Sequence, residues 1–339
     1  MLTKRIYFTK PNVAELLDFE YPVCGDNQVI AKVEYTTVSG GTERACIMGA
    51  PNTYTALVGF PTYQGYCGVG RIVETGKNVT AVKVGDRALL YHGGHATYNL
   101  IQEDKVYKID DEEIDSLDAA MVIIAAMGLG GVRKLQLELG ESAMVIGLGL
   151  LGMFSVQFLR QSGANPVIAV DFSEERRKLA LQLGADYAFS PAEENFIEKV
   201  KAVTRGKGVN AIVEVTGSAK ALQTALDCVG YTGRISLLGC TRISDTPIDF
   251  YQQVHKPGVK LIGAHNAVRP KIESYPYHWT NHDDCVAILD MIKRGRIQVK
   301  PMISRVVSPK DAPRIYTELV ENKDFPMGTI FDWGSLDKE

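Results

Sequence analysis

Apolar residues in the first 120 positions occur in short stretches separated by turn-forming residues, a pattern typical of β-strands. Glycine pairs such as Gly40-Gly41 and Gly93-Gly94 mark turns between these stretches. The pattern predicts a compact, partly barrel-like β domain. Its predicted strands cover residues 28–35, 68–74, 86–91 and 97–101.

From about residue 140, short apolar runs alternate with segments of helical periodicity. Ser173 is a predicted helix N-cap, and Glu174 and Glu175 follow it in the first turn, where the helix dipole favours anions. Alternation of this length predicts a parallel, doubly wound α/β sheet. The predicted strands are 143–146, 167–170, 187–189, 211–215, 234–238 and 259–262, and the predicted helices are 150–161, 192–204, 218–229 and one that follows Ser173.

The alternation ends after about residue 270. Pro270, Pro276 and the aromatic-rich segment YPYHW interrupt it, and a helix is predicted over 283–294. The closing stretch PMISRVVSPKDAPRIYTELV could return to the first domain. We therefore expect a β-rich domain formed by residues 1–120 and 271–339, and an α/β domain formed by residues 121–270.

The length and composition fit two domains of ordinary size. The chain of 339 residues is 45% hydrophobic, with a net charge of −3 and scattered Lys and Arg, so no nucleic-acid partner is expected. Its apolar runs are too short to span a bilayer and its N-terminus has no apolar leader, so no membrane association and a cytoplasmic location are expected. The six cysteines include no CxxC pair, which argues against a disulfide framework.

A dinucleotide-binding motif lies between the predicted strand 143–146 and the helix after it. Gly147 allows a tight turn, Gly149 lets a pyrophosphate approach the backbone, and Gly152 permits close helix–strand packing. Leu150 and Leu151 complete the motif and begin the helix, whose free N–H groups would bind phosphate.

Asp171 ends the next predicted strand, nineteen residues after Gly152. A carboxylate there accepts hydrogen bonds from the adenosine ribose and repels a 2′-phosphate, so NAD(H) is the expected cofactor. Arg176 could stack near the adenine or pair with Asp171. Arg176 and Arg177 also argue against a preference for NAD(H), because NADP enzymes use arginine nearby. The alternative is a Rossmann-like domain with incidental glycines that binds no cofactor.

Several further motifs resemble the medium-chain dehydrogenase/reductase superfamily: GDRALL (85–90), GLGLLG (147–152), VDFSEERRKLALQLGAD (170–186), EVTG (214–217) and ISLLG (235–239). The SGGTE (39–43) and GGHATY (93–98) segments resemble a subgroup related to zinc-type alcohol, polyol and glycoside dehydrogenases, which includes bacteriochlorophyllide dehydrogenases. The resemblance implies a GroES-like β-rich catalytic domain, a Rossmann domain and assembly into dimers or tetramers. It also implies further cofactor contacts from Val215, Thr216, Leu238, Gly239 and Cys240.

The motifs depart from that family at its catalytic zinc site. The resemblance places Ser39 at the position of the ligand Cys, and Gly65-Tyr66-Cys67 at the position of Gly-His-Glu. No His, Cys or Glu follows Asp118 in the segment 118–131, where a third ligand is expected, and the four-Cys lobe is missing. We therefore expect no metal, with an unorthodox site of Glu43, Cys67 and His95 as the alternative.

Without a metal, other groups must polarise the reacting oxygen and move a proton. The hydroxyl of Tyr66 could bind the substrate oxygen, and Ser39 could bind substrate. Glu43, in the SGGTE segment, and His95, in the GGHATY segment, could accept or relay the proton.

Each of these four residues also has a structural interpretation. Tyr66 could pack with a hydrated hydroxyl, Glu43 could pair with Arg44 or Arg71, and His95 could hold a turn by binding backbone. His92 is a weaker candidate, expected to be exposed at a strand end.

The segment 265–282 combines histidines with aromatic residues that have polar tips, which suits the binding of a sugar or another polar ring. His278 and Trp279 are the candidate substrate-binding residues. The equal alternative is a surface loop that packs on the β domain.

These observations favour an NAD(H)-dependent dehydrogenase of a secondary alcohol, with a sugar, glycoside or cyclitol as substrate. A zinc-free NADPH-dependent enoyl or quinone reductase is the first alternative, and Asp171 argues against it. A non-catalytic NAD(H)-binding protein is the second, because loss of activity would also remove zinc ligands.

Overall fold

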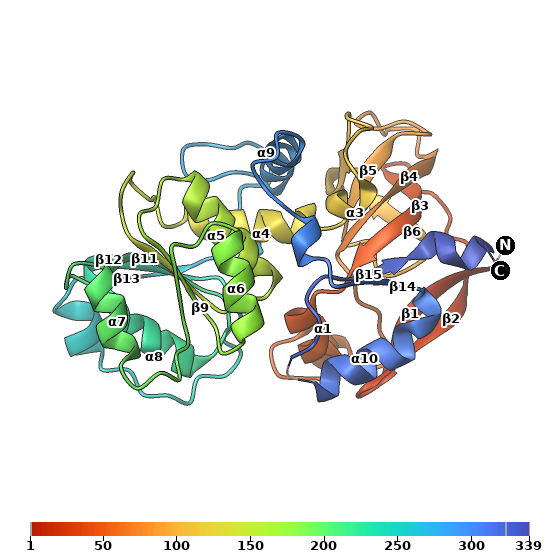
Figure 1. Ribbon diagram of the computed structural model, residues 1–339. Helices are drawn as coiled ribbons and strands as arrows, with labels where there is room; N and C mark the ends of the chain where they lie inside the picture. Colours follow the sequence, from red (N-terminus) through yellow and green to blue (C-terminus); the bar gives the residue numbers. More distant parts are fainter. Residues whose placement is uncertain (1, 323, 339) are drawn as a thin grey trace. The chain divides into compact units, whose positions relative to one another are not determined.

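A computed structural model describes residues 2–322 and 324–338 of the chain (Figure 1). The chain divides into two compact units. The first contains the chain up to Ile124, Leu289–Arg294 and the chain from Val299 onward, and the second contains Ala125–Ile288 and Gly295–Gln298. Each unit has its own core of buried apolar side chains.

The second unit is built on a six-stranded parallel sheet with the order β10-β9-β8-β11-β12-β13. Helices α5 and α6 pack on one face of this sheet, and α7 and α8 on the other (Figure 1). The strands are β8 (Ala143–Ile146), β9 (Val167–Val170), β10 (Tyr187–Phe189), β11 (Val209–Glu214), β12 (Val229–Leu237) and β13 (Lys260–Gly263). The helices are α4 (Val122–Arg133), which begins in the first unit, α5 (Leu150–Gln161), α6 (Glu174–Gln182), α7 (Phe196–Val203), α8 (Ala219–Cys228) and α9 (Asn281–Lys293).

The doubly wound parallel sheet predicted from the alternation is confirmed. All four residues of β8 and of β9 are buried, as expected for strands covered by helices on both faces. The Ser173 hydroxyl accepts a hydrogen bond from the Arg176 backbone N–H, which confirms the predicted N-cap of α6.

The first unit contains a seven-stranded sheet with the path β14-β15-β3-β4-β5-β7, in which β6 also pairs with β3, and a separate two-stranded sheet, β1-β2. Its strands are β1 (Leu2–Lys10), β2 (Val13–Glu20), β3 (Gln28–Thr37), β4 (Cys67–Thr75), β5 (Arg87–Tyr91), β6 (Tyr98–Gln102), β7 (Val106–Lys108), β14 (Arg305–Val307) and β15 (Thr329–Asp332). Its helices are α1 (Gly40–Ile47), α2 (Tyr54–Val58), α3 (Ser116–Ala119) and α10 (Ala312–Glu321).

The four strands predicted in this region are confirmed as β3 to β6. The strand predictions do not include the hairpin β1-β2, although its turn has a clear local signal. Pro11 and Asn12 connect the two strands, and Asn12 adopts φ +62°, a left-handed conformation that asparagine tolerates better than most residues. The closing segment does return to the first unit, as β14, α10 and β15.

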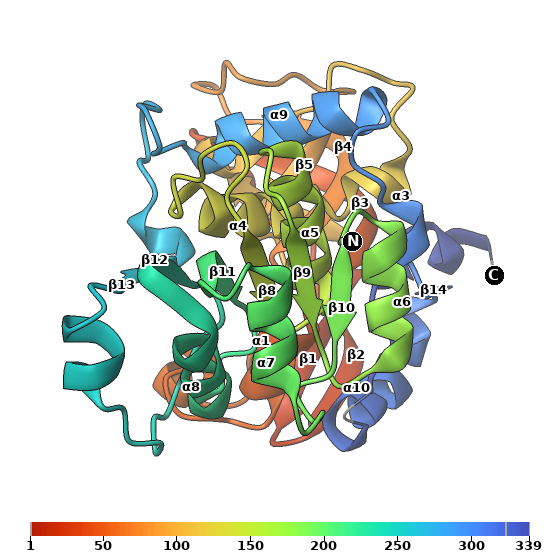
Figure 2. The same ribbon diagram turned by 60° about the vertical axis from the view of Figure 1, so that its left-hand side comes forward.

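Residues 271–288 group with the second unit, whereas the sequence assigned them to the β-rich domain. The fully buried carboxylate of Asp284, in α9, explains this. Its Oδ1 accepts from Arg133 Nε (2.8 Å) and its Oδ2 from Arg269 Nη1 (2.6 Å), and both arginines belong to the second unit. Figure 2 shows α9 beside α4, which carries Arg133. A buried carboxylate with two guanidinium partners is costly to separate from them.

No helix in the described part of the chain combines the length and the apolar character that a bilayer-spanning segment needs.

Candidate functional site

The glycine motif forms the connection between β8 and α5, and each glycine has a different constraint. Gly147 adopts φ +95°, which side-chain-bearing residues rarely adopt. A Cβ on Gly152 would lie 1.9 Å from the carbonyl oxygen of Gly147, so only glycine allows the helix to approach the loop this closely. A Cβ on Gly149 would meet nothing within 4 Å, so the backbone there borders open space. This geometry fits the backbone cradle of a dinucleotide pyrophosphate.

The amino end of α5 has free N–H groups. Gly149 is its N-cap and has no side chain to accept a hydrogen bond from the first turn. The positive end of the helix dipole and these N–H groups suit a phosphate.

Asp171 follows β9 and links the two neighbouring loops. Its Oδ2 accepts from the N–H of Leu148 (2.8 Å), inside the glycine motif, and its Oδ1 accepts from the N–H of Ser173 (2.8 Å). The carboxylate is only half-buried, and each oxygen has one further lone pair. It can therefore also accept from hydroxyl groups of a ligand.

The two arginines after Asp171 differ in their contacts. Nη1 of Arg177 donates to the carbonyl oxygens of Asp171 and Phe172, both at 2.8 Å, so this side chain stabilises the turn after β9. Arg176 is half-buried in the first turn of α6, where its backbone N–H donates to Ser173.

Glu214 organises the other loops expected to contact the cofactor, although it is not among the residues expected to contact the cofactor. Its buried carboxylate accepts from the N–H of Thr216 (2.7 Å) and of Gly217 (3.2 Å), and its backbone carbonyl accepts from Leu238 (2.9 Å) and Gly239 (2.8 Å). Burial raises its pKa, against the lowering effect of these hydrogen bonds. Among the residues expected here, Thr216 and Cys240 are exposed, Val215 and Gly239 are half-buried, and Leu238 is buried.

In the first unit, Ser39 and Tyr66 lie side by side. Ser39 precedes α1, Tyr66 precedes β4, and their hydroxyl oxygens share a short hydrogen bond. Both residues are half-buried. Burial raises the pKa of Tyr66, although hydrogen bonds from Ser39 and Thr42 oppose this effect. At neutral pH Tyr66 is therefore a protonated hydroxyl that can donate a hydrogen bond.

Glu43 and His95 form a buried pair that contacts the backbone of Ser39. Glu43 Oε2 lies 3.1 Å from His95 Nε2 and accepts from the hydroxyl of Tyr316 (2.5 Å), and Oε1 accepts from the N–H of Ser39 (2.8 Å). Glu43 is 0% exposed and His95 is 1% exposed. Burial raises the pKa of Glu43, but His95 and the hydrogen bonds from Tyr316 and Ser39 outweigh it, so the pKa lies below its usual value.

Hydrogen-bond accounting indicates which nitrogen of His95 carries the proton. Trp333 Nε1 can only donate, and it donates to Thr36 Oγ1 (2.9 Å). Thr36 can then donate its own hydroxyl proton to His95 Nδ1, which lies 2.7 Å from Thr36 Oγ1. In this arrangement the His95 proton lies on Nε2 and donates to Glu43, so the polar side-chain groups that link Trp333 to Glu43 all have partners.

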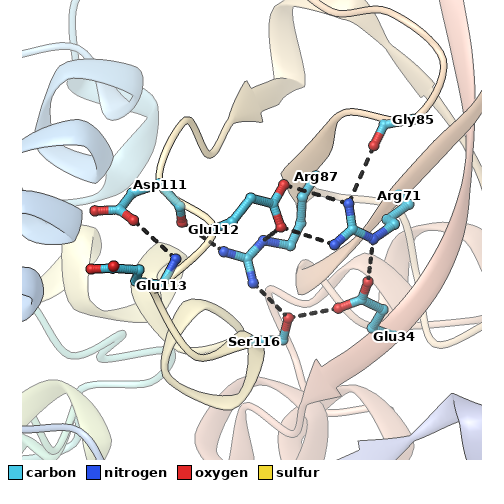
Figure 3. A network of polar contacts seen from close by, with 8 residues as sticks. All are labelled: Glu34, Arg71, Gly85, Arg87, Asp111, Glu112, Glu113 and Ser116. Atoms are coloured by element: carbon cyan, nitrogen blue, oxygen red, sulfur yellow. Dashed lines mark hydrogen bonds and ion pairs between the residues drawn. The ribbon is translucent and has the colours of Figure 1, made fainter.

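The pairings considered for Glu43 and His95 in the sequence differ from those observed. Arg44 Nη2 donates to the carbonyl of Val320 (2.7 Å). Arg71 belongs to a separate polar network, in which it contacts Glu34 (3.4 Å) and Glu112 (3.0 Å) (Figure 3). The ring of His95 contacts side chains rather than backbone.

The remaining members of the network in Figure 3 connect strands β3 and β5 to α3 and to the segment before it. Arg87 of β5 donates to the Ser116 hydroxyl (3.1 Å) and to the Asp111 carbonyl (2.8 Å), and Ser116 donates to Glu34 of β3 (2.6 Å). We assign this network to the stability of the sheet. His92 follows β5 and is exposed, as expected.

The donor set does not fit a catalytic zinc ion. Zinc favours thiolate, imidazole and carboxylate ligands, whereas Ser39 and Tyr66 present hydroxyl groups bonded to each other. Burial raises the pKa of Cys67 to about 12, and its thiol donates to the carbonyl of Ala120 (3.2 Å). Across residues 2–322 and 324–338, no three His, Cys, Asp or Glu side chains form a metal-binding group, so the alternative site of Glu43, Cys67 and His95 is not assembled.

His278 and Trp279 belong to the second unit, in the loop before α9. Nδ1 of His278 lies 3.3 Å from Lys134 Nζ, and the guanidinium carbon of Arg133 lies 3.8 Å from the centroid of the Trp279 ring. Both residues are half-buried.

The structure adds residues that the sequence did not identify. Thr36, Tyr316 and Trp333 complete the buried chain around Glu43 and His95. The only local signal for Tyr316 is its place on the apolar side of α10, with Ile315 and Leu319. Nothing in the sequence indicates that its hydroxyl meets a carboxylate 273 positions away.

Comparison with known proteins agrees with this fold. Residues 151–276 match a family model described as "Zinc-binding dehydrogenase". The D-guloside 3-dehydrogenase of Escherichia coli is 27% identical over 97% of this chain and 100% of its own. The L-threonine 3-dehydrogenase of Pyrococcus horikoshii is 30% identical over 68% of this chain and 74% of its own. In fold, the crystal structure of benzyl alcohol dehydrogenase from Acinetobacter calcoaceticus matches with a TM-score of 0.83 over 98% of this chain and 99% of its own, at 18% identity.

The similarity to D-guloside 3-dehydrogenase covers nearly the whole chain and therefore extends over both units. The protein is therefore a member of the medium-chain dehydrogenase/reductase superfamily.

Proposed function

We propose that this protein is an NAD(H)-dependent dehydrogenase that interconverts a secondary alcohol and its ketone without zinc. The observation that carries the proposal is the position of the Asp171 carboxylate, bound to the N–H of Leu148 within the glycine motif. This contact supports the proposal, because it would hold an acceptor for ribose hydroxyls next to the proposed cradle for the pyrophosphate. The bound nicotinamide would accept the hydride when the alcohol is oxidised, with the hydroxyl proton released to solvent, and would donate the hydride when the ketone is reduced.

Tyr66 and Ser39 are the groups we assign to the reacting oxygen. Because Tyr66 is protonated at neutral pH, its hydroxyl can donate to a ketone oxygen and stabilise the negative charge that develops there. Ser39 shares a hydrogen bond with Tyr66 and orients its hydroxyl.

Glu43 and His95 act differently in this proposal, because their side chains are enclosed by protein. The carboxylate of Glu43 binds the backbone N–H of Ser39 and so fixes the residue beside Tyr66. We assign both residues a positioning role.

We propose a sugar, glycoside or cyclitol as the substrate. The support is the similarity to D-guloside 3-dehydrogenase, which covers nearly the whole of both chains.

The test uses purified protein with NAD or NADP and a panel of polyols, glycosides and cyclitols. We expect NADH formation that survives treatment with a chelator, and metal content well below one zinc per chain. NADPH-dependent reduction of an enone would instead identify an enoyl reductase. Tight NAD binding without turnover on any panel would indicate a non-catalytic protein.

Replacing Asp171 by Ala is expected to weaken NAD binding about tenfold and to reduce the discrimination against NADP. The variant loses an acceptor for the ribose hydroxyls and the negative charge that repels a 2′-phosphate. Calorimetric titration with both cofactors measures the two affinities. The matched control is Asp227→Ala, at an exposed position in α8. Unchanged affinities for both cofactors would show that Asp171 is not the ribose ligand.

A further inference from the structure

A tight turn in the second unit presents two aromatic residues and a histidine. The backbones of Tyr275 and His278 hydrogen-bond each other in both directions, at 2.8 Å each. Between them lie Pro276 and Tyr277, and Tyr277 adopts φ +67°, which is unusual for a bulky residue. Such conformations persist where surrounding contacts enforce them, often beside ligand sites.

The turn is anchored on both sides. Ser274 Oγ donates to Asp283 and accepts from the N–H of Thr280 (2.9 Å), which closes the loop onto the start of α9. The rings of Tyr275 and His278 stack with their centroids 4.8 Å apart. The imidazole is therefore held in one orientation.

Two cations from the end of α4 lie against this turn. The Arg133 guanidinium covers the ring of Trp279, while its Nε binds the buried carboxylate of Asp284. Lys134 Nζ donates to His278 Nδ1 at 3.3 Å. No ion pair joins Lys134 to a carboxylate in the part of the chain that the structure describes.

The protonation of His278 follows from this contact. The ammonium of Lys134 can only donate, so Nδ1 of His278 must be the acceptor and its proton lies on Nε2. Within the described residues, neither this Nε2–H nor the Nη groups of Arg133 meets a protein acceptor. The cluster formed by Arg133, Lys134 and His278 therefore has donors in excess of acceptors.

The charge balance also favours an anion. Asp284 accepts from both Arg133 and Arg269, so one carboxylate offsets two guanidinium groups, and Lys134 adds a further positive charge. Arg133 is 24% exposed, and His278 and Trp279 are half-buried, so solvent reaches the cluster. Charged donors of this kind bind carboxylates and phosphates.

We propose that Arg133, Lys134 and His278 form an anion subsite, beside Trp279 and Tyr275, for the carboxylate or phosphate of a polyhydroxy substrate. The inference rests on the proposed function, in that the anion belongs to the alcohol that is oxidised. It narrows the substrate class from neutral sugars to sugar acids and sugar phosphates. The aromatic rings would pack against the sugar ring.

Binding can be measured without turnover through tryptophan fluorescence. The chain has two tryptophans, and Trp333 is only 2% exposed, so a ligand-induced change reports on Trp279. The full-length protein, with saturating NAD, is titrated with glucuronate, a glucose phosphate and neutral methyl glucoside. We expect at least one anionic probe to bind about tenfold more tightly than methyl glucoside, as a charge-assisted hydrogen bond predicts. The ratio of the two anionic affinities distinguishes a carboxylate from a phosphate ligand.

Four variants assign the anion preference to the cluster, and a fifth checks the source of the fluorescence signal. Lys134→Gln should abolish most of the preference for anionic probes, whereas Lys134→Arg should retain this preference. His278→Phe keeps a ring to stack on Tyr275 and should also abolish most of the preference. Lys201→Gln removes an exposed lysine from α7 and should change nothing. Trp279→Phe should remove the fluorescence signal.

Two results would overturn the subsite: equal affinity for neutral and anionic probes, or an anion preference unchanged in Lys134→Gln. Failure of the proposed function would look different. Anion binding that depends on Lys134, without NADH formation on any probe or polyol, would refute the dehydrogenase and leave the subsite in place. Turnover of neutral sugars without any anion preference would refute the subsite and leave the dehydrogenase in place.

Discussion

Replacing Tyr66 by Phe is expected to lower kcat about a hundredfold, as the loss of a hydrogen-bond donor to the reacting oxygen does in other active sites. Phenylalanine keeps the ring and removes only the hydroxyl that Ser39 contacts. Because the cofactor loops belong to the second unit, the affinity for NAD should not change. Steady-state kinetics with calorimetric titration of NAD separates the two effects.

The matched control for this variant is Tyr63→Phe. Tyr63 is 43% exposed and its ring contacts Arg5 and Tyr7, so losing its hydroxyl should leave kcat unchanged. If Tyr66→Phe retained full turnover, Tyr66 would be a packing residue. If a chelator abolished wild-type turnover and zinc restored it, the assignment of Tyr66 and Ser39 as a zinc-free pair would be wrong.

Replacing Glu43 by Gln should lower the free energy of unfolding by about 3 kcal/mol, because the buried carboxylate loses hydrogen bonds to a charged group, each worth about 1.5–3 kcal/mol. The carboxylate accepts from Ser39, His95 and Tyr316, and an amide can accept on one atom only. Its NH₂ group would face a second donor. Urea denaturation measures the loss.

The effect of Glu43→Gln should depend on pH in a defined direction. Since the pKa of Glu43 in the folded protein lies below the ordinary value of 4.5, the carboxylate stabilises the fold above that value and loses this contribution as the pH falls through the folded pKa. The difference in stability between wild type and variant should therefore be full at neutral pH and shrink in acid. Glu15→Gln, at an exposed position in β2, is the control. A difference that does not vary with pH would show that Glu43 is not ionised in the native state.

Short-range signals in the sequence determined the dinucleotide half of the protein. β8, α5, β9 and β10 begin and end at the predicted residues, and the Ser173 cap forms as expected. The reason is that each signal acts within a few positions: a buried apolar strand, glycines at a tight connection, and a hydroxyl at a helix start. The carboxylate of Asp171 meets the glycine motif because parallel strands end at the same edge of the sheet.

Only the tertiary structure decided the partners of the polar side chains. Arg44 and Arg71 are closer in sequence to Glu43 than Tyr316 is, yet the fold directs them to Val320 and Glu34. Tyr316 reaches Glu43 because α10 packs on α1. The same holds for Asp284, whose bonds to Arg133 and Arg269 assign α9 largely to the second unit. A hydrogen bond between residues distant in sequence produces no periodic pattern of polar and apolar positions. The two residues meet only after the segments between them have folded.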